Sequence, residues 1–103
     1  MRPIQLAELP APDKIRPVLI LTREVVRRHR TKVTVAPITS RVRGLQTEVL
    51  VGPGNGLDHE SVVNCDNILT IEASKLGSRV GELLPSQEPL LAAAIVAAFD
   101  LDL

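Results

Sequence analysis

The hydrophobic residues of this 103-residue chain lie in short runs that proline, glycine and polar turn residues interrupt. Short aliphatic and β-branched runs bounded by such turns are typical of β-strands. The segments predicted as strands are residues 4–9, 17–21, 32–38, 47–51, 61–65, 68–71 and 79–84. Strands so short and so closely spaced predict a small, strongly bent antiparallel sheet or half-open barrel.

The segment after the last strand predicts a helix that reaches about Phe99. Ser86 is its expected cap, and Glu88 and Pro89 fall in the first turn, where a negative charge and a proline are tolerated. Thr22 is expected to cap a second, shorter helix, with Val25 and Val26 on one side and Arg23, Arg27, Arg28 and Arg30 elsewhere. The predicted fold class is therefore mainly β with a C-terminal α-helix (α+β), in a single domain over residues 1–103.

Phe99 is the only aromatic residue, so the core must be built from aliphatic side chains. The chain also lacks the set of aromatic platforms on which many proteins stack nucleic-acid bases. A chain of this length buries a modest core, and a homodimer interface would add to it. No apolar stretch approaches the length of a membrane span, and no signal-peptide pattern is present, so a soluble, cytoplasmic protein is expected.

The net charge of zero conceals two opposed halves. Residues 1–43 contain ten bases and three acids, a net of +7, whereas residues 44–103 contain two bases and nine acids, a net of −7. Such asymmetry indicates an anionic partner for one part of the surface. Net neutrality therefore does not exclude nucleic acid as a partner.

Metal sites and nucleophilic triads find little support. Cys65 is alone, which excludes an intramolecular disulfide and a cysteine-based zinc site. A buried small hydrophobe is favoured for Cys65 over a nucleophile paired with histidine. A solvated loop is favoured over an ion site for Asp58, His59 and Glu60. The glycine-rich segment 52–56 lacks the lysine of a phosphate-binding loop and predicts a hairpin turn, so no metal or cofactor is expected.

Arg16 and Thr39 are the residues best suited to form a catalytic site. Arg16 precedes one predicted strand and Thr39 follows another, so the two converge at one end of the sheet if the strands are neighbours. A guanidinium and a hydroxyl both donate hydrogen bonds to phosphate oxygens. The alternative is a solvated strand end in which Arg16 forms a salt bridge with Glu48 or Asp13.

Four collinear blocks of sequence resemble the MazF/PemK family of toxins. They are Arg-Pro-Val-Leu-Ile-Leu at 16–21, Val-Ala-Pro-Ile-Thr-Ser at 35–40, Arg-Gly-Leu-Gln-Thr-Glu-Val at 43–49 and Ser-Val-Val-Asn-Cys-Asp-Asn at 61–67. The likeness is greatest to the short-N-terminus branch of mycobacterial MazF proteins. It implies an SH3-like small barrel of the MazF/CcdB toxin type, a homodimer, and a toxin that a MazE-like antitoxin neutralises in a type II toxin–antitoxin system.

The resemblance also implies metal-independent, sequence-selective cleavage of single-stranded RNA through the substrate's own 2′-hydroxyl, giving a 2′,3′-cyclic phosphate. The family's catalytic arginine and threonine fall on Arg16 and Thr39. Messenger, ribosomal or transfer RNA would be the substrate. The residues expected to contact RNA are Arg28, Ser40, Arg41, Arg43, Ser61 and Asn67, and the basic segment 23–43 is expected to follow phosphates.

This chain departs from the family at its start, where residues 10–14 replace a longer loop whose glutamate has no clear counterpart. The general base is therefore unassigned, since arginine stays protonated. Two other readings stay open. One is a CcdB-like poison that binds a protein without catalysis, and the other is an inactive module that binds RNA or antitoxin.

Overall fold

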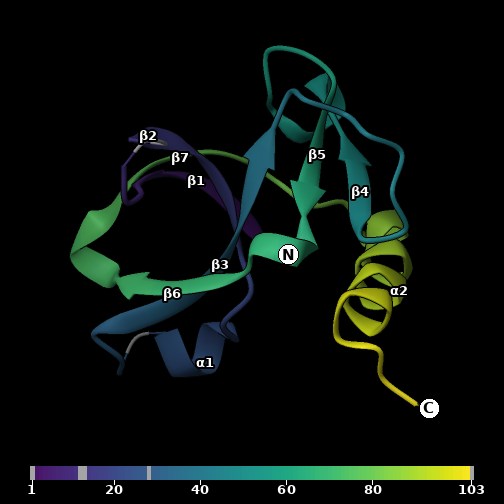
Figure 1. Cartoon of the computed structure of the whole chain (residues 1–103). Helices are drawn as coiled ribbons and strands as arrows, with labels where there is room; N and C mark the ends of the chain where they lie inside the picture. The colour runs from purple at the N-terminus through teal and green to yellow at the C-terminus, as the bar shows by residue number, and fades with distance from the viewer. Residues whose placement is uncertain (1, 12–13, 28, 103) are drawn as a thin grey trace.

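Seven strands form one antiparallel sheet in residues 2–11, 14–27 and 29–102, the part of the chain that the computed structural model describes (Figure 1). They are β1 (Pro3–Glu8), β2 (Ile15–Ile20), β3 (Lys32–Thr39), β4 (Glu48–Val51), β5 (Ser61–Asn64), β6 (Leu69–Glu72) and β7 (Leu76–Glu82). The order across the sheet is β4-β5-β3-β2-β1-β7, and β6 pairs with β3. The predicted mainly β fold class is confirmed.

The bend of the sheet lies in β3. Its first half pairs with β6 and its last residues pair with β5, while β2 lies along its other side. Pro37 lies near the end of β3, which is an inner strand of the sheet. The proline is accommodated because residues 36 and 37, which are registered with β2 on one side, fall on the other side between the stretches registered with β6 and β5. On that side no ladder partner needs the missing N–H of the proline.

Two α-helices accompany the sheet in the described part of the chain: α1 (Glu24–Arg27) and α2 (Glu88–Phe99). Short 3-10 turns occupy residues 53–55, 65–67, 73–75 and 85–87. The prediction that Ser86 caps α2 is wrong, because Ser86 lies inside the turn at 85–87. Gln87 precedes the helix instead, and its Oε1 accepts a hydrogen bond from the backbone N–H of Leu84 at 2.9 Å.

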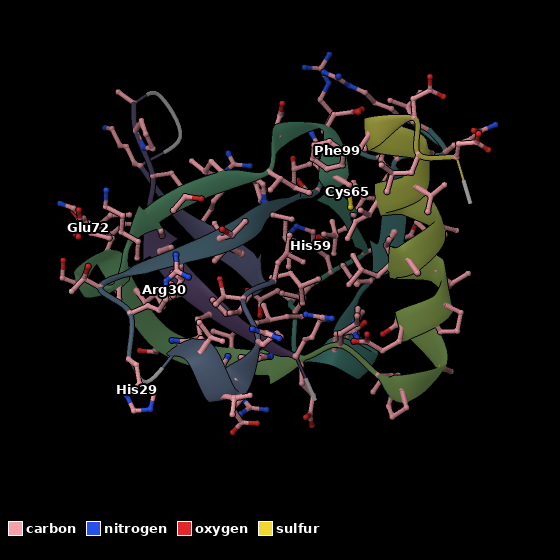
Figure 2. The ribbon with its side chains drawn as sticks, turned by 90° about the horizontal axis from the view of Figure 1, so that it is seen from below. His29, Arg30, His59, Cys65, Glu72 and Phe99 are labelled. Carbon is pink, nitrogen blue, oxygen red and sulfur yellow. The ribbon has the colours of Figure 1, made fainter. Side chains whose placement is uncertain are left out.

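The two ends of the bent sheet carry different structures. The loop at 52–60 lies at one end, where β3 ends and β5 begins, and α1 lies at the opposite end (Figure 1). The loop at 40–47 starts beside the loop at 52–60 and runs along β4 to the start of that strand. His29 and Arg30 belong to the α1 end (Figure 2). Lys32 begins β3 at that end and Thr39 finishes it at the other, so their separation along the strand is up to roughly 23 Å at 3.3 Å per residue.

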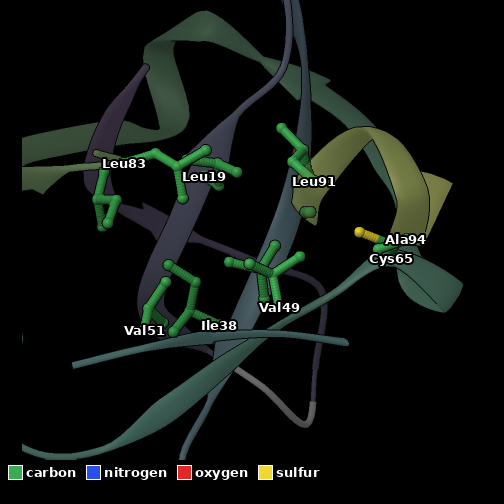
Figure 3. Close-up of a cluster of buried hydrophobic side chains, with 11 residues drawn as sticks. Leu19, Ile38, Val49, Val51, Cys65, Leu83, Leu91 and Ala94 are labelled. Carbon is green, nitrogen blue, oxygen red and sulfur yellow. The ribbon is translucent and has the colours of Figure 1, made fainter. Parts of the chain in front are cut away.

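The core is aliphatic, as the single aromatic residue required. One cluster lies under α2 and includes Leu19, Ile38, Val49 and Leu91 (Figure 3). A second cluster consists of side chains from β1, β2, β3 and β6, including Val35. Phe99 takes little part, since it is 57% exposed at the end of α2.

Candidate functional site

Arg16 and Thr39 are brought together by the pairing of β2 with β3. The observed register sets Val18 against Pro37, and its antiparallel continuation sets Arg16 against Thr39. On its other side Arg16 pairs with Ala7 of β1, so the arginine is carried by an inner strand of the sheet. Both side chains are partly exposed. The convergence predicted from the sequence is therefore present.

Two cavities meet at this pair of residues. One has a volume of about 300 Å³ and is lined by Arg16, Pro37, Thr39, Arg41, Arg43, Glu48, Asn64 and Asn67. The other has a volume of about 500 Å³ and is lined by Leu6, Arg16, Pro17, Ile38, Thr39, Ser40, Gly56, Leu57, Asp58, His59, Ser61 and Val80. We call them the polar cavity and the mixed cavity. Arg16 and Thr39 line both, so they stand at the junction.

The chemistry of the two cavities differs. The polar cavity places three arginines around a small volume, which suits phosphate oxygens. The mixed cavity has an apolar lining that includes Leu6, Ile38 and Val80, with hydroxyl and imidazole groups beside it. A flat ring with polar edges fits such a lining, because the ring faces are apolar and the edges form hydrogen bonds.

Glu48 shapes the wall of the polar cavity. Its Oε1 accepts hydrogen bonds from the backbone N–H groups of Arg43, Gly44 and Leu45 at 3.1, 2.9 and 3.2 Å. These bonds fold the loop at 40–47 back onto the start of β4. The position of the Arg43 side chain at the cavity is thus tied to a carboxylate on a strand.

Thr39 keeps a hydrogen to donate. Its Oγ1 accepts the backbone N–H of Arg41 at 3.2 Å, which uses a lone pair and leaves the hydroxyl hydrogen available. One hydrogen bond therefore links the Thr39 hydroxyl to the loop at 40–47.

The bend after β5 positions Asn67 at the polar cavity. Thr47 donates to Asp66 Oδ2 at 2.6 Å, and the Asp66 N–H donates to Asn64 Oδ1 at 2.9 Å. Ser61 lies at the mixed cavity and is 6% exposed, with its Oγ donating to the carbonyl of His59 at 3.2 Å. Ser40, Arg41 and Arg43 also line one of the two cavities.

The remaining basic residues lie elsewhere. The predicted contact Arg28 is outside the described residues, and its neighbours Arg27 and Arg30 belong to the α1 end of the sheet. Arg2 binds Glu88, with Nε and Oε2 3.0 Å apart. The +7 segment is therefore divided between two ends of the molecule and does not form one continuous track beside the cavities.

His59 is the residue that the sequence did not single out for this site. The loop at 52–60 folds it to the mixed cavity that Arg16 and Thr39 share. Its flanking acids, Asp58 and Glu60, made a solvated loop the natural interpretation. His59 is found near Arg16 and Thr39 only because the folded chain places its loop beside the start of β2 and the end of β3.

Cys65 is buried in the core beneath α2, near Ala94, and is 1% exposed (Figure 3). Burial, with a smaller contribution from the charge of Asp66, raises the pKa of its thiol from 9.0 to about 11. A thiol that is neutral at physiological pH and covered by a helix is a poor nucleophile. The interpretation of Cys65 as a buried small hydrophobe is confirmed.

A stability measurement checks this assignment. Because the unfolded thiol ionises near pH 9.0 and the folded one near 11, the stability that Cys65 contributes is complete below pH 9.0 and is lost as pH rises toward about 11. We expect wild type to lose more free energy of unfolding than Cys65→Ala between pH 8 and 11, as measured by urea denaturation. Parallel losses in the two proteins would contradict the assignment.

Among the described residues, no group of three or more His, Cys, Asp or Glu side chains is arranged to hold a metal ion. No helix in the described part of the chain is long and apolar enough to span a membrane.

Comparisons with known proteins converge on one family. Residues 4–99 match the family described as PemK-like, MazF-like toxin of type II toxin–antitoxin system. Endoribonuclease MazF3 of Mycobacterium tuberculosis is 65% identical over 102 residues, covering 99% of this chain and 96% of the relative. The solved Mycobacterium tuberculosis toxin MazF-mt6 superposes with a TM-score of 0.94 at 64% identity, covering 99% of this chain and 100% of that one.

A more distant solved structure contains an endoribonuclease together with its own antitoxin. A solved endoribonuclease in complex with its cognate antitoxin, from a mycobacterial species, has a TM-score of 0.81 at 28% identity and covers 96% of this chain and 94% of its own. The toxin-type small barrel expected from the sequence resemblance is confirmed by these superpositions.

Proposed function

Since this chain belongs to the PemK-like, MazF-like toxins of type II toxin–antitoxin systems, we propose that it is an endoribonuclease that cleaves single-stranded RNA and so inhibits translation and growth. The observation that carries the proposal is the position of Arg16 and Thr39 at the junction of the two cavities. The endoribonuclease names of its relatives support the same activity.

The scissile phosphate would lie at this junction. The 2′-hydroxyl of the preceding ribose attacks phosphorus, the bond to the 5′-oxygen breaks, and the products carry a 2′,3′-cyclic phosphate and a 5′-hydroxyl. Negative charge grows on the non-bridging oxygens during this attack. The Arg16 guanidinium and the Thr39 hydroxyl donate to those oxygens and lower the barrier, without a metal ion.

The nucleotides on either side would occupy the two cavities. Arg41 and Arg43 bind phosphate in the polar cavity, and Asn67 meets a base edge there. A second base rests in the mixed cavity against its apolar lining, with Ser40 and Ser61 at its edges. Sequence selectivity would come from these two positions. Arg27 and Arg30 at the α1 end would meet phosphates only in a longer RNA.

We propose a homodimer and an antitoxin as the protein partners. Leu50 on β4 and Leu90 on α2 are 57% and 55% exposed, apolar side chains that a second copy would cover. An acidic antitoxin segment would enter the polar cavity, because its arginines attract carboxylates as they attract phosphate. We propose the cytoplasm as the site of this activity, because the proposed RNA substrate is found there.

Cleavage of a defined RNA tests the proposal. We expect wild-type protein to cut a long single-stranded RNA at repeated short sequences, at the same rate with and without EDTA. A matched RNA with a single 2′-deoxyribose before the cut position should resist, since it lacks the nucleophile. The new ends should accept phosphate from polynucleotide kinase directly, because they are 5′-hydroxyls.

Each alternative has its own outcome in this experiment. Cutting that EDTA abolishes, or cutting of the 2′-deoxy RNA, would contradict the mechanism. RNA that is bound without being cut would indicate an inactive binding module. RNA that is neither bound nor cut would indicate a poison whose target is a protein.

A further inference from the structure

The proposed reaction needs a group that accepts a proton. The 2′-hydroxyl must lose its proton as it attacks phosphorus, and a positioned base accelerates that step. The Arg16 guanidinium stays protonated in proteins, and the Thr39 hydroxyl is too weak a base. The two residues at the junction therefore stabilise charge but leave proton transfer unassigned.

The side chains around the two cavities narrow the choice of base. Apart from arginine, the titratable side chains among the described residues of the two linings are Glu48, Asp58 and His59. Glu48 already accepts three backbone N–H groups through Oε1, which commits its carboxylate to the loop at 40–47. Among the described lining residues this leaves Asp58 and His59, both in the mixed cavity.

Imidazole is the better proton acceptor of the two because histidine gains and loses a proton near neutral pH and is the most frequent general base in enzymes. On the premise of the proposed function, we propose that His59 accepts the proton of the 2′-hydroxyl. The 2′-oxygen forms its bond to phosphorus, the bond from phosphorus to the 5′-oxygen breaks, and that oxygen takes a proton from water. The imidazolium then returns its proton to solvent.

The loop that carries His59 is anchored at both ends. Toward β5, the buried Ser61 hydroxyl donates to the His59 carbonyl at 3.2 Å. Toward β4, the buried Asn55 side chain accepts the Gly52 N–H at 3.0 Å and donates to the carbonyl of Glu82 at 3.0 Å. The backbone around His59 is therefore fixed beside the junction while its side chain is exposed to an incoming RNA.

The chain supplies a matched control. His29 is the other histidine, is also exposed, and lies at the α1 end, well separated from His59 (Figure 2). A change at either position removes one exposed imidazole, but only His59 lines a cavity with Arg16 and Thr39.

The test compares His59→Ala with His29→Ala in single-turnover cleavage of the RNA described above. We expect His59→Ala to lower the rate at saturating protein by about a hundredfold with little change in RNA affinity, and His29→Ala to cut as wild type does. Imidazole added to the buffer should restore part of the lost rate in His59→Ala and none in Arg16→Ala.

Three outcomes would overturn the assignment. The first is a wild-type cleavage rate for His59→Ala, and the second is a reduced rate in His59→Ala that added imidazole does not raise. The third is a wild-type cleavage rate for His59→Gln without imidazole, since glutamine reproduces the contacts of histidine but not its basicity. Thermal unfolding of each variant verifies that the loop change leaves the fold intact. Failure of wild type to cut RNA would refute the proposed function itself, which separates the two results.

Discussion

Arg16→Ala is expected to lower RNA cleavage by about 10²- to 10³-fold, the effect of removing one donor aimed at a developing oxyanion, about 2.7–4 kcal/mol. The reason is positional. Arg16 lies on an inner strand, at the junction of both cavities, so no neighbouring arginine of the loop at 40–47 can replace it without moving the backbone. Single-turnover rates at saturating protein measure the effect on the chemical step.

Conservative variants separate geometry from charge. Arg16→Lys keeps the positive charge but loses the planar pair of donors, so it should recover only part of the activity. Thr39→Val should slow cleavage and Thr39→Ser should not, because serine keeps the hydroxyl. Arg79→Ala is the control for lost positive charge, since Arg79 lies on β7 and its Nη2 is 3.2 Å from Glu82 Oε2. Equal losses in Arg16→Ala and Arg79→Ala would contradict a specific role for Arg16.

The sequence predicted the framework of the site because local patterns determine it. Residues 17–21 and 32–38 contain the β-branched and aliphatic runs that became β2 and β3. Two adjacent strands in an antiparallel sheet bring the start of one beside the end of the other, so the meeting of Arg16 and Thr39 followed from strand order alone.

Other features depend on tertiary packing and could not be predicted from the sequence. Leu76, Gly77 and Ser78 extend β7 at its start although glycine and serine are poor strand formers, because β1 pairs with β7 on both sides of them, at Leu76 and at Arg79. The +7 segment looked like one basic surface, but β3 carries its two parts to opposite ends of the sheet. His59 became a site residue only through the position of its loop, which no periodicity encodes.

Two glycines connect stability to the site. Gly81 of β7 lies against the turn at 53–55, and a Cβ at Gly81 would overlap the carbonyl oxygen of Asn55 and lie 2.7 Å from its carbonyl carbon. Gly56 faces the same strand with a φ of +90°, and a Cβ there would overlap the carbonyl oxygen of Val80. The close approach of β7 to this turn holds the loop that carries His59.

Gly81→Ala is therefore expected to lower the free energy of unfolding by about 3 kcal/mol, at the upper end for an overpacked site, because the clash is with backbone atoms that cannot rotate away. Gly77→Ala on the same strand is the matched control, since its Cβ would meet Leu6 atoms at 3.5 and 3.6 Å, ordinary contact distances. Urea denaturation at one fixed protein concentration measures both variants. Equal stabilities would show that the turn yields to β7 without cost.

A destabilised Gly81→Ala should also cut RNA more slowly while still folded, because the displaced turn moves one wall of the mixed cavity away from Arg16 and Thr39.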